Sequence, residues 1–255
     1  MAYRDIRLNS LDFIKYDPNG YNKLKIKEVK RWFKERNIKT AVINISGGAD
    51  STYVAYLLTN ALCKENVIGI LQPNGEQKDI LDSIKVVKTL GINYINININ
   101  DQYNNMLKNL YEFDKNFKID VNFENARINI APRIRMINAY MIANAVNGAV
   151  VGTGNASERY VGYFTKWGDG ACDYNPIKDI LKTDLIKIGL ELGIPKELIC
   201  KTPADGLTGK SDEEKYGFTY KQLDEYIKTG ECNNEEIKEK IDRMHENSRH
   251  KFEEI

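Results

Sequence analysis

The sequence predicts an α/β protein built on a doubly wound, mostly parallel sheet with helices on both faces. Short apolar runs rich in β-branched residues alternate along the chain with longer stretches whose apolar residues recur at helical spacing. Glycine or proline closes the runs at 40–46, 67–73 and 148–154. Such alternation implies βαβ units, which place a parallel sheet between two layers of helices. The 255 residues are enough to bury roughly 70–75% of the unfolded surface in such a core.

The first half of the chain gives the reason for each element. Leu24, Val29 and Phe33 lie on an apolar stripe with lysine and glutamate between them, which predicts a helix. The run TAVINIS then predicts a strand covered on both faces, because it has almost no polar side. The expected order is a helix over 21–36, a strand over 40–46, a helix over 50–63, a strand over 67–73 and a helix over 76–90.

The run INYINININ, residues 92–100, alternates isoleucine with asparagine and predicts a further strand. Ile95, Ile97 and Ile99 would share one face of it. An asparagine-rich loop is the weaker alternative, because the alternation is strict. After it we expect a helix over 101–113, a polar connection to about 125, a helix over 132–146, a strand over 148–154, a functional loop over 155–176, a helix over 182–192, a loop over 202–217, and helices over 219–229 and 234–246.

Composition narrows the class of protein. A hydrophobic content of 42% with 29% charged residues is typical of folded globular chains. The net charge of +1 argues against a general electrostatic nucleic-acid binder. The sequence contains no run of about 18 apolar residues, the length that a membrane-spanning helix needs. Because no segment has the composition of a linker, we expect a single domain over 1–255, with a helical extension at about 1–38 and a helical tail at about 219–255.

The cysteines and the N-terminus indicate a reducing compartment. The four cysteines are far apart, without a CxxC pair, which argues against both structural zinc and a disulfide framework. The first twenty residues carry charges throughout and lack the apolar region of a signal peptide. We therefore expect a cytoplasmic protein.

The segment SGGADS, Ser46 to Ser51, is the most informative motif. It follows a predicted strand and begins a predicted helix, so its glycines and the helix N-terminus would present free N–H groups to a phosphate. Asp50 would repel a phosphate unless it held a cation, which suggests Mg²⁺. The alternative is that Asp50 only caps the helix, with the glycines as a turn. The chain contains neither GxxxxGK[ST] nor GxGxxG, so this is not a common mononucleotide or dinucleotide loop.

SGGADS resembles the SGGxDS loop of the ATP pyrophosphatases, which cleave ATP between the α and β phosphates and adenylate a substrate. Within that superfamily the chain is similar to the ammonia-dependent NAD synthetases from about residue 40 to residue 251. The matching segments stand in the family's order: PNGEQKD (73–79), NIAPRIRM (129–136), GTGNASE (152–158), YFTKWGDGACDYNPI (163–177), LKTDL (181–185) and the pair His250 and Lys251. The resemblance implies a Rossmann-like sheet of the ATP pyrophosphatase type.

The resemblance also implies the site residues. ATP would be bound by Asn44, Ile45, Ser46, Gly47, Gly48, Ala49, Asp50, Ser51, Thr153, Lys182 and Ala204. Deamido-NAD would be bound by Arg133, Lys166, Asp173, His250 and Lys251. Mg²⁺ would be held by Asp50 and Glu158, and the catalytic groups would be Asp50, Glu158 and Lys182.

The residues themselves leave alternatives open. Arg133 and Arg135 lie two positions apart on one predicted helix, so one could reach an anion while the other makes a structural contact. Glu158 could equally be a capping glutamate or an exposed charge. Lys182 lies near a helix start, where a positive charge does not favour the helix, and this favours a ligand role. Trp167 is more readily explained as a core or loop-anchoring residue than as one that stacks on a ligand.

Two positions depart from the family pattern. Ala131 and Pro132 stand where a polar residue and alanine are common, so we expect the helix to begin near Pro132. Ala204 stands where many relatives have serine or threonine. A methyl group makes no hydrogen bond, so Thr202 or the backbone would have to supply that contact to ATP.

The resemblance implies an enzyme that uses ATP and ammonia to convert deamido-NAD into NAD, acting as a homodimer. No persuasive Cys/His or Ser/His/Asp set occurs, which agrees with a reaction in which the substrate and ammonia supply both nucleophiles. A tRNA-modifying relative would need redox cysteines or a basic extension. A non-catalytic nucleotide-binding module would have no use for the loop at 163–177.

Overall fold

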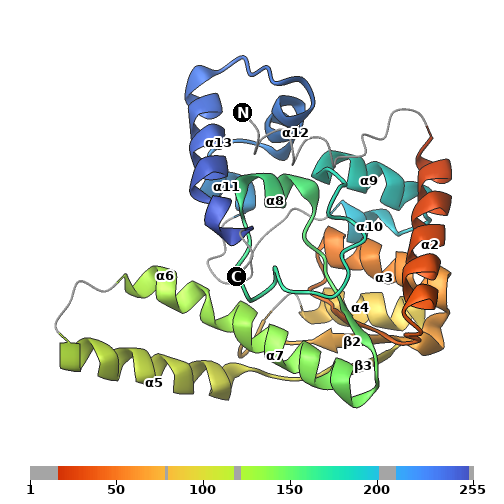
Figure 1. The fold of residues 1–255 in the computed structure, drawn as a ribbon, viewed down its shortest axis with the longest axis horizontal. Coiled ribbons are helices and arrows are strands. Elements are labelled where there is room, and N and C mark those ends of the chain that lie inside the picture. Colours follow the sequence, from red (N-terminus) through yellow and green to blue (C-terminus); the bar gives the residue numbers. More distant parts are fainter. Residues whose placement is uncertain (1–16, 78–79, 118–121, 201–210, 253–255) are drawn as a thin grey trace.

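The computed structural model describes residues 17–77, 80–117, 122–200 and 211–252. Within these ranges four strands form one parallel sheet in the order β3-β2-β1-β4 (Figure 1). The strands are β1 (Ala41–Asn44), β2 (Val67–Leu71), β3 (Asn93–Asn96) and β4 (Ala149–Val151). The predicted α/β class and parallel sheet are therefore confirmed.

The helices fall into the intervals between and after the strands. They are α2 (Pro18–Glu35), α3 (Ala49–Leu62), α4 (Ile80–Leu90), α5 (Asn100–Phe117), α6 (Phe123–Ile128), α7 (Ile130–Ala145), α8 (Ala156–Val161), α9 (Lys182–Glu191), α10 (Lys196–Ile199), α11 (Asp212–Tyr216), α12 (Tyr220–Thr229) and α13 (Glu235–Asn247), with 3₁₀ turns η1 (Lys64–Asn66) and η2 (Arg249–Lys251). None of the helices in these described ranges is long and apolar enough to cross a membrane.

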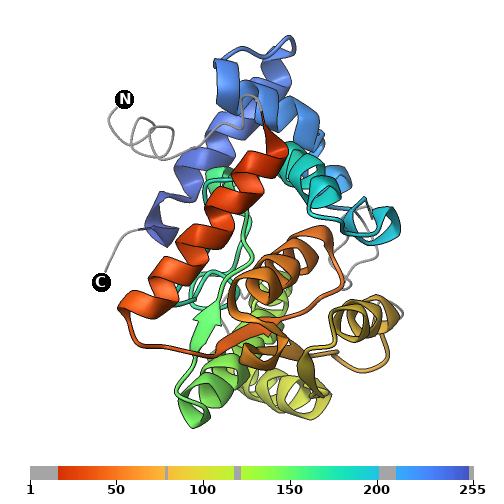
Figure 2. The ribbon, with the colours of Figure 1, turned by 90° about the vertical axis from the view of Figure 1, so that its right-hand side faces the viewer.

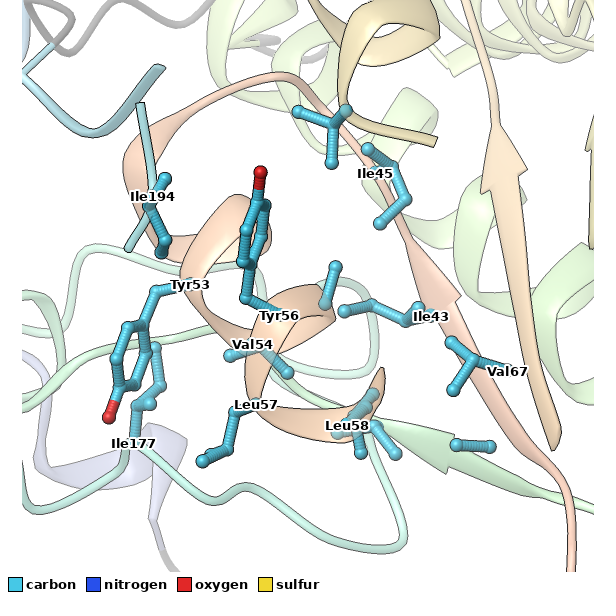
Figure 3. Packing of buried hydrophobic residues seen from close by; sticks show 14 of the residues in the cluster. Ile43, Ile45, Tyr53, Val54, Tyr56, Leu57, Leu58, Val67, Ile177 and Ile194 are labelled. Atoms are coloured by element: carbon cyan, nitrogen blue, oxygen red, sulfur yellow. The ribbon is translucent and has the colours of Figure 1, made fainter. Parts of the chain in front are cut away.

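Each face of the sheet is covered by helices. Successive side chains of a strand point to opposite faces, so Ile43 packs with α2, α3 and α4 while Val42 packs against α7. Figure 3 shows Leu58 of α3 on the side of Ile43 and Val67, whereas Leu57 points to the other side, towards Ile177. Because α3 is buried nearly all round, its first turn is held rigidly at the end of β1.

The helices that follow β4 have an apolar cluster of their own. Tyr216, Leu223, Tyr226 and Ile241 pack against α8 and Leu181, next to the start of α9. In Figure 1 α12 lies above α8 while α11 and α13 lie to its left, and Figure 2 shows α2 running alongside α3. The C-terminal helices therefore close one side of the region where α3, α8 and α9 begin.

The strand expected at 92–100 is shorter and less buried than its pattern predicts. β3 ends at Asn96, and Ile95 is 46% exposed, whereas Ile99 beyond the strand is fully buried. Among the described strands, β3 lies at one edge of the sheet and pairs with β2 alone. Its Tyr94 is also 45% exposed, so the described residues cover each face of the strand only in part. The strand expected to reach residue 100 therefore ends at Asn96, and Ile97 and Ile99 lie beyond it.

Short helices occupy segments that the sequence analysis left as loops. α8 lies in the expected loop at 155–176, and α6, α10 and α11 were also missed. Helices of four to six residues carry too little periodicity to be recognised. α7 begins at Ile130 rather than near Pro132. Proline fits there because N–H groups in a first helical turn have no helical acceptor.

Candidate active site

A cavity of about 940 Å³ opens at the carboxyl ends of β1, β2 and β4. This is the edge at which open parallel sheets bind ligands, because the loops there leave each strand before a helix begins. The cavity is lined by these predicted site residues: Asn44, Ile45, Ser46, Gly48, Ala49, Asp50, Ser51, Thr153, Glu158, Lys182 and Lys251. Residues predicted from separate motifs are thus brought to one place.

The SGGADS loop turns sharply between β1 and α3. Gly47 has a φ of +78°, and a Cβ atom there would lie 2.8 Å from the backbone nitrogen of Ser83. Only glycine fits this close approach to α4. The hydroxyls of Ser46 and Ser51 lie 3.1 Å apart and hydrogen-bond across the turn. The loop therefore exposes the first turn of α3 to the cavity without a bulky side chain in front of it.

Asp50 does not cap its own helix. The N-cap of α3 is Gly48, which makes no side-chain capping bond, and Asp50 stands in the first turn. One carboxylate oxygen of Asp50 accepts a hydrogen bond of 2.9 Å from Asn155 Nδ2, and the other is paired with Lys182 Nζ. The capping alternative for Asp50 was wrong, because its carboxylate is directed towards α8 and α9.

Lys182 is the first residue of α9, and its side chain is only 3% exposed. Burial alone would lower the pKa of Lys182, but the charges of Asp50 and Glu158 raise it above its ordinary value. Its ammonium also lies 5.5 Å from the centre of the Tyr220 ring. The result is a fixed cation at the mouth of the SGGADS loop.

Glu158 combines two roles that the sequence presented as alternatives. It is the third residue of α8 and forms a capping box with Asn155, whose N–H donates to Glu158 Oε2 at 3.2 Å. Burial, and then the charge of Asp50, raise the pKa of Glu158 well above its usual range, although Lys182 opposes this. The capping function is real, and the carboxylate also shares the electrostatic environment of Asp50.

The carboxylates of Asp50 and Glu158 suit Mg²⁺ by their chemistry. Both carry hard carboxylate oxygens, and Mg²⁺ is held in enzymes by one or two carboxylates together with substrate phosphates and water. Within the described ranges there is no group of three or more His, Cys, Asp or Glu side chains that could bind a metal alone. Two carboxylates fill only part of the coordination shell of Mg²⁺, so phosphate oxygens and water would have to complete it.

A further wall of the site comes from Asp212 and Lys215 of α11 and was missed in the sequence. Asp212 is buried and accepts hydrogen bonds from Tyr220 Oη at 3.2 Å and from Tyr163 Oη at 3.3 Å. Burial raises the pKa of Asp212 above its ordinary value. The signal that could have located this wall is the capping box between Ser211 and Glu214 at the start of α11.

The residues expected to bind the second substrate divide into two groups. Arg133, Lys166 and His250 lie outside the cavity lining, where Lys166 Nζ donates to the His250 carbonyl at 2.7 Å and Arg133 donates to the Lys166 carbonyl at 3.4 Å. Lys251 lines the cavity and donates to the carbonyls of Gly162 and Phe164 at 2.8 and 2.7 Å. The C-terminal turn η2 is therefore joined to the loop at 162–170.

Asp173 lies apart from both groups. Its carboxylate accepts a hydrogen bond of 2.7 Å from the backbone nitrogen of Val150 in β4, so it braces the edge of the sheet.

Trp167 is 52% exposed, which excludes a core role for that side chain. Ala204, together with Thr202, lies outside the described residues.

Arg135, rather than Arg133, lines the cavity. Its Nε donates to the carbonyl of Gln72 at 3.0 Å, and the Gln72 amide donates in turn to Asn44 Oδ1 at 2.7 Å. The two arginines do lie on different sides of α7, as their spacing predicts. Which of them faces the cavity depends on the rotation of α7 against the sheet, and this was not readable from the sequence.

Comparison with known proteins finds several that are similar to this chain. The family model described as NAD synthase matches residues 22–255. The NH₃-dependent NAD⁺ synthetase of Thermococcus sibiricus is 45% identical over 194 residues, which are 76% of this chain and 73% of that protein. The corresponding protein of Pyrococcus horikoshii is 41% identical, over 81% of this chain and 77% of its own. The solved structure of NMN synthetase from Francisella tularensis has a TM-score of 0.86 at 28% identity and covers 94% of this chain and 98% of its own.

Proposed function

The chain belongs to the NAD synthase family, and we propose from this how its residues carry out the reaction of the ammonia-dependent members. It is an ATP-dependent ligase that amidates deamido-NAD with ammonia, the final step of NAD biosynthesis. The nicotinate carboxylate attacks the α-phosphorus of ATP and releases pyrophosphate. Ammonia then attacks the carbonyl of the acyl-adenylate and gives NAD and AMP.

The observation that supports this proposal best is the convergence of Asp50, Glu158 and Lys182 on the SGGADS loop. The loop and the first turn of α3 offer N–H groups and a positive helix end to the triphosphate. Lys182 adds a buried positive charge that stabilises the departing pyrophosphate. Asn44, Ile45, Thr153 and the other lining residues of this end of the cavity would hold the rest of ATP.

We assign Mg²⁺ to Asp50 and Glu158. When bound, the ion would neutralise phosphate charge as pyrophosphate leaves. Lys182 already pairs with Asp50, so Asp50 would contact both the bound ion and this ammonium group. Neither carboxylate needs to act as a nucleophile, because the substrate and ammonia make both attacks.

Deamido-NAD would lie between the cavity and the surface groups on α7 and η2. Arg133 supplies an exposed positive charge and Lys166 a half-buried one at the outer edge, and Lys251 supplies one inside the cavity. His250 would contribute through its backbone contact to Lys166. Asp173 would act on this substrate only through the segment it braces, since its carboxylate is bonded to β4.

We also propose a homodimer formed through α5, α7 and the edge strand β3. Ile137 and Met141 are four residues apart on α7, so they share one face of the helix, and they are 56% and 57% exposed. Exposed apolar side chains also occur on the neighbouring elements: Tyr94 and Ile95 on β3, and Met106 on α5. A concentration of such residues is typical of an interaction surface, and it supports burial against a second copy.

The test is one assay of the purified chain with ATP, Mg²⁺, deamido-NAD and ammonium, in which NAD and AMP are followed together. Equal formation of both products, dependent on all four components, is the expected result. A parallel arm replaces deamido-NAD with nicotinate mononucleotide, because the Francisella tularensis relative is an NMN synthetase. Turnover of the mononucleotide in preference to deamido-NAD would contradict the assignment of the substrate.

A further inference from the structure

Helix α9, which begins with Lys182, has no N-cap of its own. The capping position is Leu181, whose side chain makes no capping hydrogen bond. The first two N–H groups of the helix are bonded instead by side chains from other elements. Lys182 N–H donates to Ser157 Oγ at 2.9 Å, and Thr183 N–H donates to Asp224 Oδ2 at 2.8 Å. The start of α9 is therefore held from α8 and α12.

These two capping side chains are joined to each other. The hydroxyl of Ser157 donates to the other carboxylate oxygen of Asp224. Ser157 is fully buried and Asp224 is 2% exposed, so neither group can replace these bonds with water. Ser157 also directly precedes Glu158 in α8. One carboxylate thus ties the start of α9 to the helix that carries the second predicted metal ligand.

We infer that Asp224 is a positioning residue, which acts on catalysis by fixing the first turn of α9 and so the ammonium of Lys182. The inference rests on the proposed function for its effect on turnover. Asp224 is on α12, outside the motifs that carry the family resemblance, and it does not line the cavity. Its carboxylate takes the place of a local cap on α9 while its negative charge faces the positive helix end.

The physical demand for such a residue follows from the position of Lys182. Without the two capping bonds, buried N–H groups would be left unsatisfied and the first turn would shift or fray. A displacement of about 1 Å near reacting groups can lower turnover by about 100-fold. A long lysine side chain with a nearly buried ammonium follows its backbone closely, because the surrounding groups leave it little room.

The same two helices provide a matched control. Asp184, in the first turn of α9, is paired with Lys228 of α12 at 2.8 Å. Lys228→Met removes a contact between α9 and α12 but leaves the bonds to Lys182 and Thr183 unchanged. A general loosening of the two helices would therefore affect both variants, whereas a loss of positioning would affect only Asp224→Asn.

The test compares Asp224→Asn, Ser157→Ala and Lys228→Met in the full chain. Asparagine keeps the shape of the side chain, but its amide is a donor on one side. The Ser157 hydroxyl and the Thr183 N–H both donate to this side chain, so one of them would lose its acceptor. We expect Asp224→Asn and Ser157→Ala to lower kcat on the order of tenfold or more, with the KM for deamido-NAD changed less than twofold. Lys228→Met should retain kcat within twofold. If Asp224→Asn does not fold, Ser157→Ala carries the test, because it removes only one hydroxyl.

Binding of α,β-methylene ATP with Mg²⁺ gives a second readout that needs no turnover. Asp224→Asn should weaken this affinity on the order of tenfold in the native background and have no further effect in a Lys182→Met background. An equal, additive loss in both backgrounds would overturn the inference, as would native kcat in a folded Asp224→Asn. If the unmodified chain forms no NAD, the proposed function fails, yet the binding comparison still decides the role of Asp224.

Discussion

The ammonium of Lys182 is paired with the carboxylate of Asp50, which joins the first turn of α9 to the first turn of α3 at one end of the cavity. Two positive helix ends would repel each other without an intervening negative charge. Asp50 supplies that charge, and Asn155 of α8 orients it through its second oxygen. An incoming triphosphate would meet this arrangement already assembled.

Replacing Asp50 with asparagine should abolish most of the pyrophosphate release. The change removes one of two proposed carboxylate ligands and leaves Lys182 without its partner, so we expect a loss of about 100-fold or more in kcat. Asp101→Asn makes the same chemical change in the first turn of α5, at an exposed position, and should have native activity. Circular dichroism of both variants shows whether the fold is kept. Native turnover in Asp50→Asn would contradict its metal role.

Gly47→Ala should reduce both stability and activity. A methyl group at φ +78° costs about 1–2 kcal/mol, and here it also meets the Ser83 backbone. The matched variant is Gly230→Ala, at φ +76° with no atom within 4 Å of the added Cβ. Urea denaturation should show a larger loss of unfolding free energy for Gly47→Ala, and only this variant should lose ATP binding. Equal losses in the two variants would mean that the close approach to α4 does not matter.

Arg133→Ala should act on the second substrate alone. Loss of its exposed charge is expected to raise the KM for deamido-NAD about tenfold, or about 1.4 kcal/mol, with the KM for ATP unchanged. Arg36→Ala is the control, because Arg36 is another exposed arginine that donates one hydrogen bond, of 3.3 Å, to a backbone carbonyl. Initial-rate kinetics with each substrate varied separately measure the difference. An equal rise in both KM values would argue that Arg133 only supports the loop.

Ile137→Asp combined with Met141→Asp should convert the proposed dimer into a monomer. Two charges on the apolar face of α7 would have to be buried at the interface without partners, which is strongly unfavourable. Leu190→Asp places a charge on a comparably exposed apolar residue of α9, and should leave the assembly unchanged. Sedimentation velocity reports the state of each variant. If the native chain sediments as a monomer over the concentration range of the assay, the proposed homodimer is contradicted.

The stability of Asp224→Asn relative to the native chain should depend on pH. Burial raises the pKa of Asp224 in the folded state, although its hydrogen bonds with Ser157 and Thr183 oppose this. The stability that a raised carboxyl pKa contributes is present in full below the unfolded value of about 3.9 and is lost as pH rises through the folded value. Asparagine does not titrate. The native chain's advantage in unfolding free energy should therefore be greatest near pH 4 and decline towards neutrality, as measured by urea denaturation. An advantage that grows with pH would contradict the raised pKa.

Local patterns were sufficient for the sheet and for the loop that begins α3. The β-branched runs and their closing glycines mark strands because both effects act within a few residues. SGGADS was recognisable for the same reason, since a glycine turn, exposed N–H groups and a helix start are all encoded in adjacent positions. The capping box of Asn155 and Glu158 is equally local, and it was left as one of several alternatives only because α8 is so short.

Long-range packing decided what each of those groups does. The sequence alone could not show that Asp224 of α12 would cap α9, that Arg135 rather than Arg133 would line the cavity, or that Ile95 would be left half exposed on an edge strand. Each outcome depends on how separately formed elements rotate and dock against one another. The sequence by itself determined the sheet and its phosphate-type loop through local propensities, whereas only the tertiary structure decided the orientation and the partners of the charged groups around it.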